Sequence, residues 1–90
     1  MSAPSPYPLP AALDAGAAGE LARSLLALRG QPLALDASGV GRVGALGLQV
    51  LVSARRTWAR DGLALTIERP SEAFVAALAR AGLEADFEGS

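Results

Sequence analysis

Cysteine, histidine and lysine are all missing from this chain of 90 residues. Without cysteine, disulfides and thiolate metal sites are excluded. Without histidine, the commonest general base and the commonest metal ligand are absent, which leaves only carboxylate or hydroxyl chemistry. The composition therefore argues against an enzyme, and it predicts neither a metal nor a cofactor.

Charge of one sign and long apolar runs are also lacking. Eight arginines and nine carboxylates give a net charge of −1 and are scattered along the chain, so no basic stripe is available for nucleic acid or an anionic membrane. The mean hydropathy is +0.32, but no apolar run reaches the roughly 18 residues of a membrane span. The first ten residues lack the basic and apolar regions of a secretory signal. These absences predict a cytoplasmic protein that does not insert into a membrane.

The length predicts one domain, because about 90 residues bury one core but not two. Alternating prolines predict a flexible lead over residues 1–6. The single domain is then expected over residues 7–87, with a frayed end over 88–90.

Periodicity predicts alternating strands and helices. Strands are expected over 7–13, 31–36 and 63–68, with a short final strand over 83–87, and helices over 17–28, 44–60 and from Ser71, the expected N-cap, to Gly82. The connections suit parallel neighbours. The strands carry leucine at every second position, which places these side chains on one face of the sheet. The helices are therefore expected to cover mainly that face. The predicted fold is α/β, with a small mixed or mostly parallel sheet of about four strands.

The stretch from Leu33 to Val52 organises the chain. It combines an apolar strand, an Asp-Ala-Ser-Gly exit at Asp36–Gly39 and a glycine-rich loop that leads into the helix from Gly44. Open α/β folds build binding sites where a helix begins at the carboxyl edge of a sheet. This corner is therefore the expected functional region.

The helix over 44–60 carries two stripes. We assign one to the core, and it comprises Gly47, Val50, Leu51, Ala54 and Trp58. The other is half apolar and exceeds what burial in so small a domain needs, so it is the candidate partner surface. It comprises Ala45, Leu48, Gln49, Val52 and Arg56.

The polar residues of the corner have structural and functional interpretations. Asp36 is interpreted as a turn former rather than a catalytic or metal-binding carboxylate, because no second acid is near it in the sequence. Ser38 is interpreted as a local cap, with phosphorylation as the alternative. The glycines of the loop resemble a nucleotide loop only loosely, because the lysine of a Walker motif is missing.

Three segments resemble the STAS domain family over roughly Leu9 to Phe87. They are DASGV from Asp36, RVGALGLQVL from Arg42 and PSEAFVAALARAGL from Pro70. The family comprises small bacterial signalling modules typified by anti-sigma factor antagonists, and it also occurs in lipid-transport complexes and on anion-transporter tails. The resemblance implies a non-catalytic protein-interaction module. The pattern QVLxxARxTWA from Gln49 is similar to compact STAS proteins of bacterial chemotaxis gene clusters.

The resemblance also implies how this chain differs from family members switched by phosphorylation. In those members the loop before the second helix has the sequence Asp-Ser-Ser-Gly or Asp-Thr-Ala-Gly, and its first hydroxyl accepts phosphate from a partner kinase. The matching residues here are Gly44, Ala45, Leu46 and Gly47. Since alanine has no hydroxyl, phosphorylation at Ala45 is excluded, and Ser38 is the remaining candidate.

The predicted partner is another protein: a histidine-kinase-like anti-sigma ATPase, a chemotaxis component or a transporter permease. A weak homodimer is left open. The runner-up function is a soluble accessory subunit of a lipid or anion transport complex, and an alternative of another class is a small nucleotide-binding or carboxylate-dependent enzyme. The predicted partner-binding residues are Ser38, Gly44, Ala45, Leu48, Gln49, Val52 and Arg56.

Overall fold

The computed structural model describes residues 6–87 as an α/β fold built on parallel strands. The main sheet has the order β1 (Tyr7–Pro8), β3 (Leu33–Asp36), β5 (Leu65–Glu68), and a second sheet pairs β2 (Ala12–Leu13) with β4 (Arg42–Val43). All these pairs are parallel. The predicted fold class is confirmed, although the strands form two small sheets. The lead predicted over 1–6, except for residue 6, and the end predicted over 88–90 lie outside the described residues.

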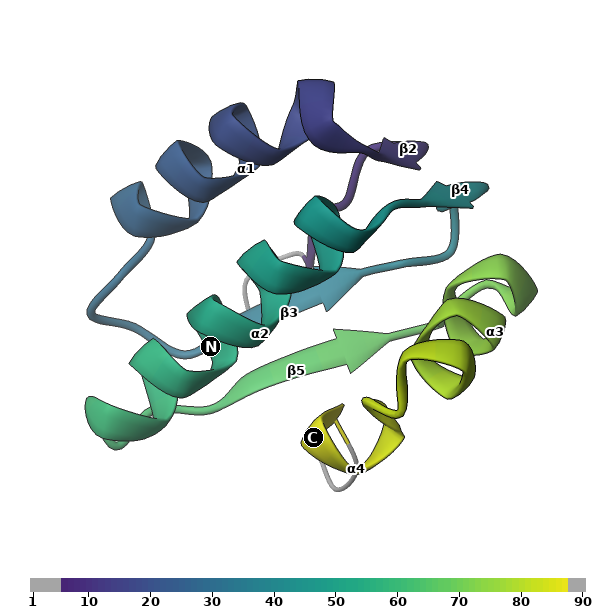
Figure 1. Ribbon diagram of the computed structural model, residues 1–90. Coiled ribbons are helices and arrows are strands. Elements are labelled where there is room, and N and C mark those ends of the chain that lie inside the picture. Colours follow the sequence, from purple (N-terminus) through teal and green to yellow (C-terminus); the bar gives the residue numbers. More distant parts are fainter. Residues whose placement is uncertain (1–5, 88–90) are drawn as a thin grey trace.

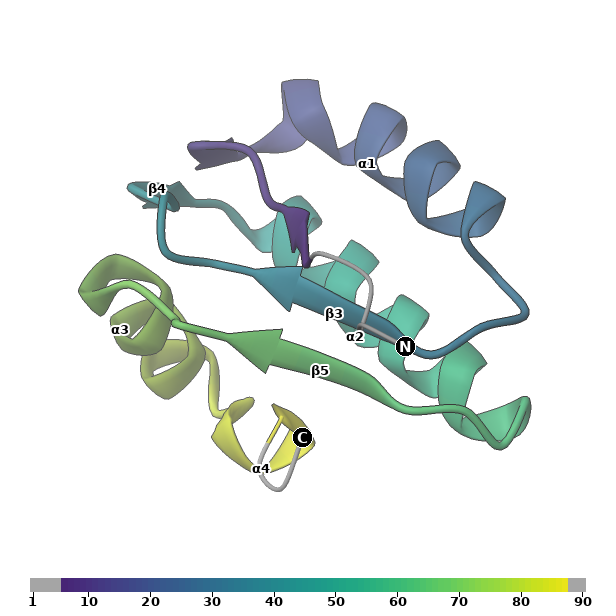
Figure 2. The same ribbon diagram turned by 180° about the vertical axis from the view of Figure 1, so that it is seen from behind.

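Four helices follow these strands: α1 (Ala15–Ala27), α2 (Ala45–Arg60), α3 (Glu72–Ala81) and α4 (Glu84–Phe87). In Figure 1, α2 crosses in front of β3 and runs beside β5, and in the reverse view of Figure 2 β3 lies in front of α2. Within the main sheet, Leu35 and Leu65 are buried, whereas their neighbours Ala34 and Thr66 are partly exposed. Since neighbouring side chains along a strand point to opposite faces of the sheet, the face that carries Leu35 and Leu65 is the one that the helices cover.

Local capping explains three helix ends, the start of α1 and both ends of α3. The side chain of Asp14 accepts a hydrogen bond from Ala17 N and begins α1. The Ser71 hydroxyl accepts one from Phe74 N, which confirms the predicted N-cap of α3. Gly82 ends α3 with φ at +69°, a left-handed conformation that suits glycine.

The structure corrects the strand predicted over 7–13. This segment forms two short strands, β1 and β2, that belong to different sheets. Pro10 has no amide hydrogen to donate, and the chain changes partner around it. Leu9 N donates to Asp36 O in the main sheet, whereas the carbonyl of Ala11 accepts from Gly41 and Arg42.

The final strand predicted over 83–87 is also wrong, because residues 84–87 form the short helix α4. Leu83 and Phe87 are separated by four residues, so one helical turn places both on the same side. Phe87 is buried in the core and Leu83 packs against it. The segment therefore brings Leu83 and Phe87 to the core as a helical turn and leaves Ala85 exposed.

The core lies between the main sheet and the helices. Its largest fully buried side chains are Trp58, Phe74, Leu13, Leu25, Leu35 and Leu51. Trp58 also uses its polar atom, because Nε1 donates to the carbonyl of Gln31 at 2.7 Å. This bond ties the end of α2 to the segment that enters β3.

Candidate functional site

Asp36, at the end of β3, organises the corner. Its Oδ1 accepts a hydrogen bond from Ser38 N at 2.9 Å, and its Oδ2 lies 2.7 Å from the guanidinium nitrogen of Arg69. Hydrogen bonds from the Ser38 amide and hydroxyl hold the pKa of Asp36 below its ordinary value, and Arg69 lowers this pKa further. Both carboxylate oxygens are engaged, so the interpretation of Asp36 as a turn former is confirmed.

The corner is fastened to the loop between β5 and α3. Ser71 N donates to Ala37 O at 3.1 Å, and the Ser71 hydroxyl donates to Val40 O at 2.6 Å. Ala37 N in turn donates to Glu68 O at 3.0 Å. These bonds hold the backbone around Ser38, whose side chain remains exposed.

The start of α2 packs closely on β2. Gly44 is the N-cap, and its amide donates to Leu13 O at 2.7 Å. At Gly47, a Cβ would overlap the backbone of Leu13, so only glycine permits this approach. Ala45 begins the helix and is exposed. A methyl group therefore occupies the position where the resemblance implies a phosphorylated hydroxyl in other family members.

The predicted partner surface is only partly exposed. Ala45, Gln49 and Arg56 are exposed, whereas Leu48 and Val52 retain only 7% and 6% exposure and belong to the core. The expectation that these two side chains form an exposed apolar patch is wrong. No structural observation tests partner binding itself, so the exposed residues Ser38, Ala45, Gln49 and Arg56, with the half-buried Gly44, remain a prediction.

Leu48 and Val52 are buried because further elements pack against their side of α2. Arg55 donates to Leu65 O at 2.6 Å, and its guanidinium lies 5.8 Å from the centre of the Phe87 ring. Helix α4 and strand β5 therefore approach α2 beside Leu48 and Val52. The core stripe of α2 is wider than the sequence analysis assumed.

The large exposed apolar residue of α2 is Leu46, at 56% exposure. Sequence reasoning missed it by assigning it to neither stripe. Leu46 is three residues before Gln49 and seven before Ser53, so the three lie along one side of the helix. That spacing was the available signal.

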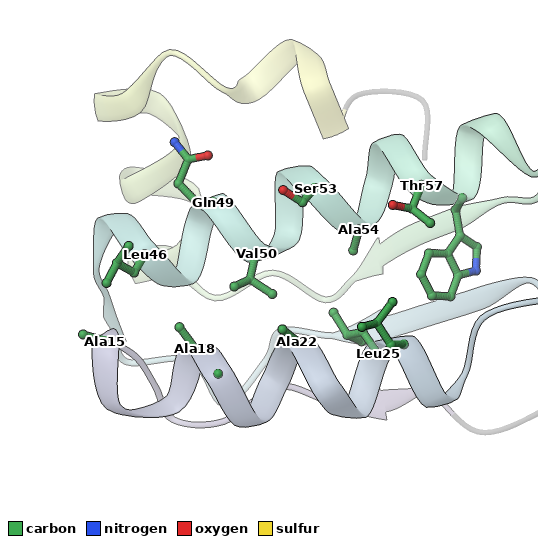
Figure 3. Close-up of a pocket in the computed structure, with 13 residues that line it drawn as sticks. Ala15, Ala18, Ala22, Leu25, Leu46, Gln49, Val50, Ser53, Ala54 and Thr57 are labelled. Atoms are coloured by element: carbon green, nitrogen blue, oxygen red, sulfur yellow. The ribbon is translucent and has the colours of Figure 1, made fainter.

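A groove of about 530 Å³ between α1 and α2 was also missed (Figure 3). We name it the α1–α2 groove. Its lining residues are Ala15, Ala18, Gly19, Ala22, Leu25, Leu26, Leu46, Gln49, Val50, Ser53, Ala54, Thr57 and Trp58. The signal in the sequence was a stripe of small residues on α1, from Ala15 to Ala22, spaced i, i+3, i+4 and i+7.

Neither a metal site nor a membrane-spanning helix is found in the part of the chain that the structure describes. Among the side chains that the structure describes, no group of three or more acidic, histidine or cysteine residues is arranged to hold a metal ion. Among the described helices, none has both the length and the apolar character needed to cross a membrane.

Comparison with known proteins identifies the fold and the general role. No curated protein matches the chain significantly. The family model described as "Mlab, STAS domain" matches residues 9–87, which is nearly the whole described domain. STAS domains are generally non-catalytic regulatory modules that mediate protein–protein interactions. The α/β fold, the corner after β3 and this match together show that the chain belongs to the STAS domain family.

Proposed function

We propose that this STAS domain is a non-catalytic binding module of bacterial signal transduction, and that its protein partner contacts the exposed side of α2 at the corner. We name this surface the α2 outer face. It comprises Ser38, Gly44, Ala45, Leu46, Gln49 and Arg56, with the exposed Leu46 in place of the buried Leu48 and Val52.

The observation that carries the proposal is the exposed methyl group of Ala45 beside the exposed Leu46 at the start of α2. The fully buried centre of a protein interface is more apolar than its rim, and the two adjacent exposed apolar side chains at the start of α2 suit such a centre. Because Ala45 has no hydroxyl, the surface stays competent to bind at all times. Control then rests with the partner or with the abundance of either protein.

An enzymatic role finds less support at this corner. Asp36 is committed to Ser38 and Arg69, and Asp61 is committed to Arg29. A carboxylate that already accepts two hydrogen bonds is poorly suited to act as a general base. Titration of the purified domain with nucleotides tests the remaining enzymatic alternative, and we expect no binding.

The partner is to be identified by co-purification of the tagged chain from native cells. A histidine-kinase-like ATPase or a chemotaxis component supports the signalling role. A permease or its ATPase supports the alternative role as an accessory subunit of a lipid or anion transport complex. Recovery of neither class after crosslinking contradicts the proposal.

Isothermal titration of the identified partner then tests the surface. We expect Ala45→Asp to weaken the complex roughly tenfold more than Ala45→Ser, which corresponds to about 1.4 kcal/mol. A helix N-terminus tolerates a carboxylate, so the loss arises at the interface rather than in the free domain. Equal affinities for the two variants would remove Ala45 from the contact.

A further inference from the structure

The α1–α2 groove lies partly outside the α2 outer face and has a shape of its own. Leu25, Ala54 and Trp58 are buried at its base, and Leu26 and Leu46 stand at its edges with 61% and 56% exposure. Figure 3 shows Ala15, Ala18 and Ala22 of α1 pointing toward Leu46 and Val50 of α2. The groove therefore runs along two adjacent helices and is lined mainly by apolar side chains.

Small residues on α1 leave room for another backbone to approach. Ala15, Ala18, Gly19 and Ala22 all line the groove. A Cβ at Gly19 would meet only the tip of Arg23, at 3.8 Å. An amphipathic helix can place its apolar side chains in such a groove at i, i+3, i+4 and i+7.

Three arginines lie beside the groove. Arg23 lies over Gly19, and Arg56 and Arg60 continue the stripe of α2 that contains the groove residues Gln49 and Ser53. All three arginines are exposed, and none forms an ion pair with another side chain that the structure describes. They are therefore available to an incoming anionic group.

No carboxylate lines the groove itself. Helix α2 contains none, and the one carboxylate of α1, Glu20, lines a separate depression that also includes Tyr7. At the helix ends, Asp14 caps α1, and Asp61 is paired with Arg29. The pKa of Asp61 is lowered mainly by Arg29 and also by the nearby charge of Arg60. The groove thus combines an apolar floor with a rim on which arginines outnumber carboxylates.

We propose that the α1–α2 groove binds an amphipathic helix of a partner protein whose apolar stripe is flanked by aspartate or glutamate. The charges select this occupant over a second copy of the chain, because a symmetric contact between two such grooves would bring arginine rims together. The inference rests on the proposed function only in its assumption that the groove binds a protein. It identifies the chemistry of that protein.

The proposal can be tested with two designed peptides. Each has about 18 residues, or five helical turns, with leucine and alanine at i, i+3, i+4 and i+7. One carries glutamate beside the apolar stripe and the other carries lysine at the same positions. In fluorescence anisotropy with the full chain, we expect the glutamate peptide to bind at least roughly tenfold more tightly, and added salt to reduce this preference.

Gly19→Leu is the decisive variant, because it fills the groove without threatening the fold. Leucine favours a helix more than glycine does, so the melting temperature should not fall. We expect affinity for the glutamate peptide to fall at least roughly tenfold. Ala27→Leu adds bulk at an exposed position of α1 outside the groove and should leave affinity unchanged. Arg23→Glu should remove most of the preference for glutamate over lysine.

Several outcomes overturn the proposal. They are failure of the glutamate peptide to bind, equal binding of the two peptides, and full binding by Gly19→Leu. A wild-type dimer in sedimentation analysis that Gly19→Leu converts to a monomer would assign the groove to a second copy instead. If the natural partner is released by Ala45→Asp but not by Gly19→Leu, the groove is rejected while the proposed function stands. If neither variant affects the natural partner, both the groove and the α2 outer face are rejected.

Discussion

Gly47 of α2 lies against the backbone of Leu13, so closely that a side chain at position 47 would overlap both the carbonyl and the Cβ of Leu13. This contact joins the first turn of α2 to β2. Leu13 O also accepts from Gly44 N at 2.7 Å, so one peptide group sets the position of the helix start. The exposed Ala45 lies between these two glycines, and the contact therefore positions the proposed partner surface.

Gly47→Ala should destabilise the domain by about 1–3 kcal/mol, because the added methyl group meets backbone that cannot move independently. The better helix propensity of alanine offsets only part of this loss. Urea denaturation measures the change. Gly39→Ala is the control, since a Cβ there meets nothing within 4 Å, and it should stay within about 0.5 kcal/mol of wild type. Equal stabilities for the two variants would contradict the close contact.

Leu48→Arg should unfold the domain about as severely as Ala54→Glu, at a cost on the order of several kcal/mol, because both positions are buried. Leu46→Arg is the matched control, with the same substitution two residues away. It should change stability by no more than about 0.5 kcal/mol, because Leu46 is largely exposed. Thermal melts decide between them. A Leu48→Arg protein that stays stable and unfolds cooperatively would contradict the burial of Leu48.

Purified protein incubated with ATP and a cognate kinase should take up no phosphate at Ala45 and little at Ser38. The first expectation follows from the missing hydroxyl. The second follows from the hydrogen bonds that Ser38 makes to Asp36, because a phosphate there would face a carboxylate. Intact-mass measurement reports the uptake. Stoichiometric phosphate on Ser38 would establish a switch at that position.

Stability should fall in acid because of two carboxylates. Hydrogen bonds from Ser38 lower the pKa of Asp36, and the hydrogen bond from Arg29 lowers that of Asp61, both below 3.8. Each group therefore stabilises the fold above its ordinary pKa and loses this contribution as pH falls through the lower, folded value.

Urea midpoints should accordingly change little above about pH 5 and decrease below about pH 4. Asp36→Asn and Asp61→Asn should each flatten this acid decrease, and the double variant should flatten it most. An unchanged acid slope in the double variant would show that other groups control the pH dependence.

Ser71→Ala should destabilise the domain by about 1–2 kcal/mol, because the hydroxyl both caps α3 and donates to Val40 O. Ser71→Thr keeps a hydroxyl and should recover most of the loss. Urea denaturation compares the two variants, and hydrogen exchange of the Phe74 amide reports the cap directly. Unchanged exchange in Ser71→Ala would contradict the cap.

The sequence by itself determined the order of the main elements and several of their ends. Ser71 and Gly82 act through local backbone chemistry, so the beginning and end of α3 followed from residue type. Asp36 was predictable as a turn former for the same reason, because its partner Ser38 is only two residues away. The missing hydroxyl at Ala45 needs no structure, since it is a property of the side chain.

Tertiary structure decided which sides of α2 are covered. Helical periodicity relates Leu46, Leu48 and Val52 to one another, but it does not specify how many neighbours pack around the helix. Leu48, Val52 and Phe87 belong to one buried core cluster, whereas α1 approaches α2 on the other side and leaves the groove open. These contacts join residues distant in the chain, so their outcome depends on packing that no local pattern contains.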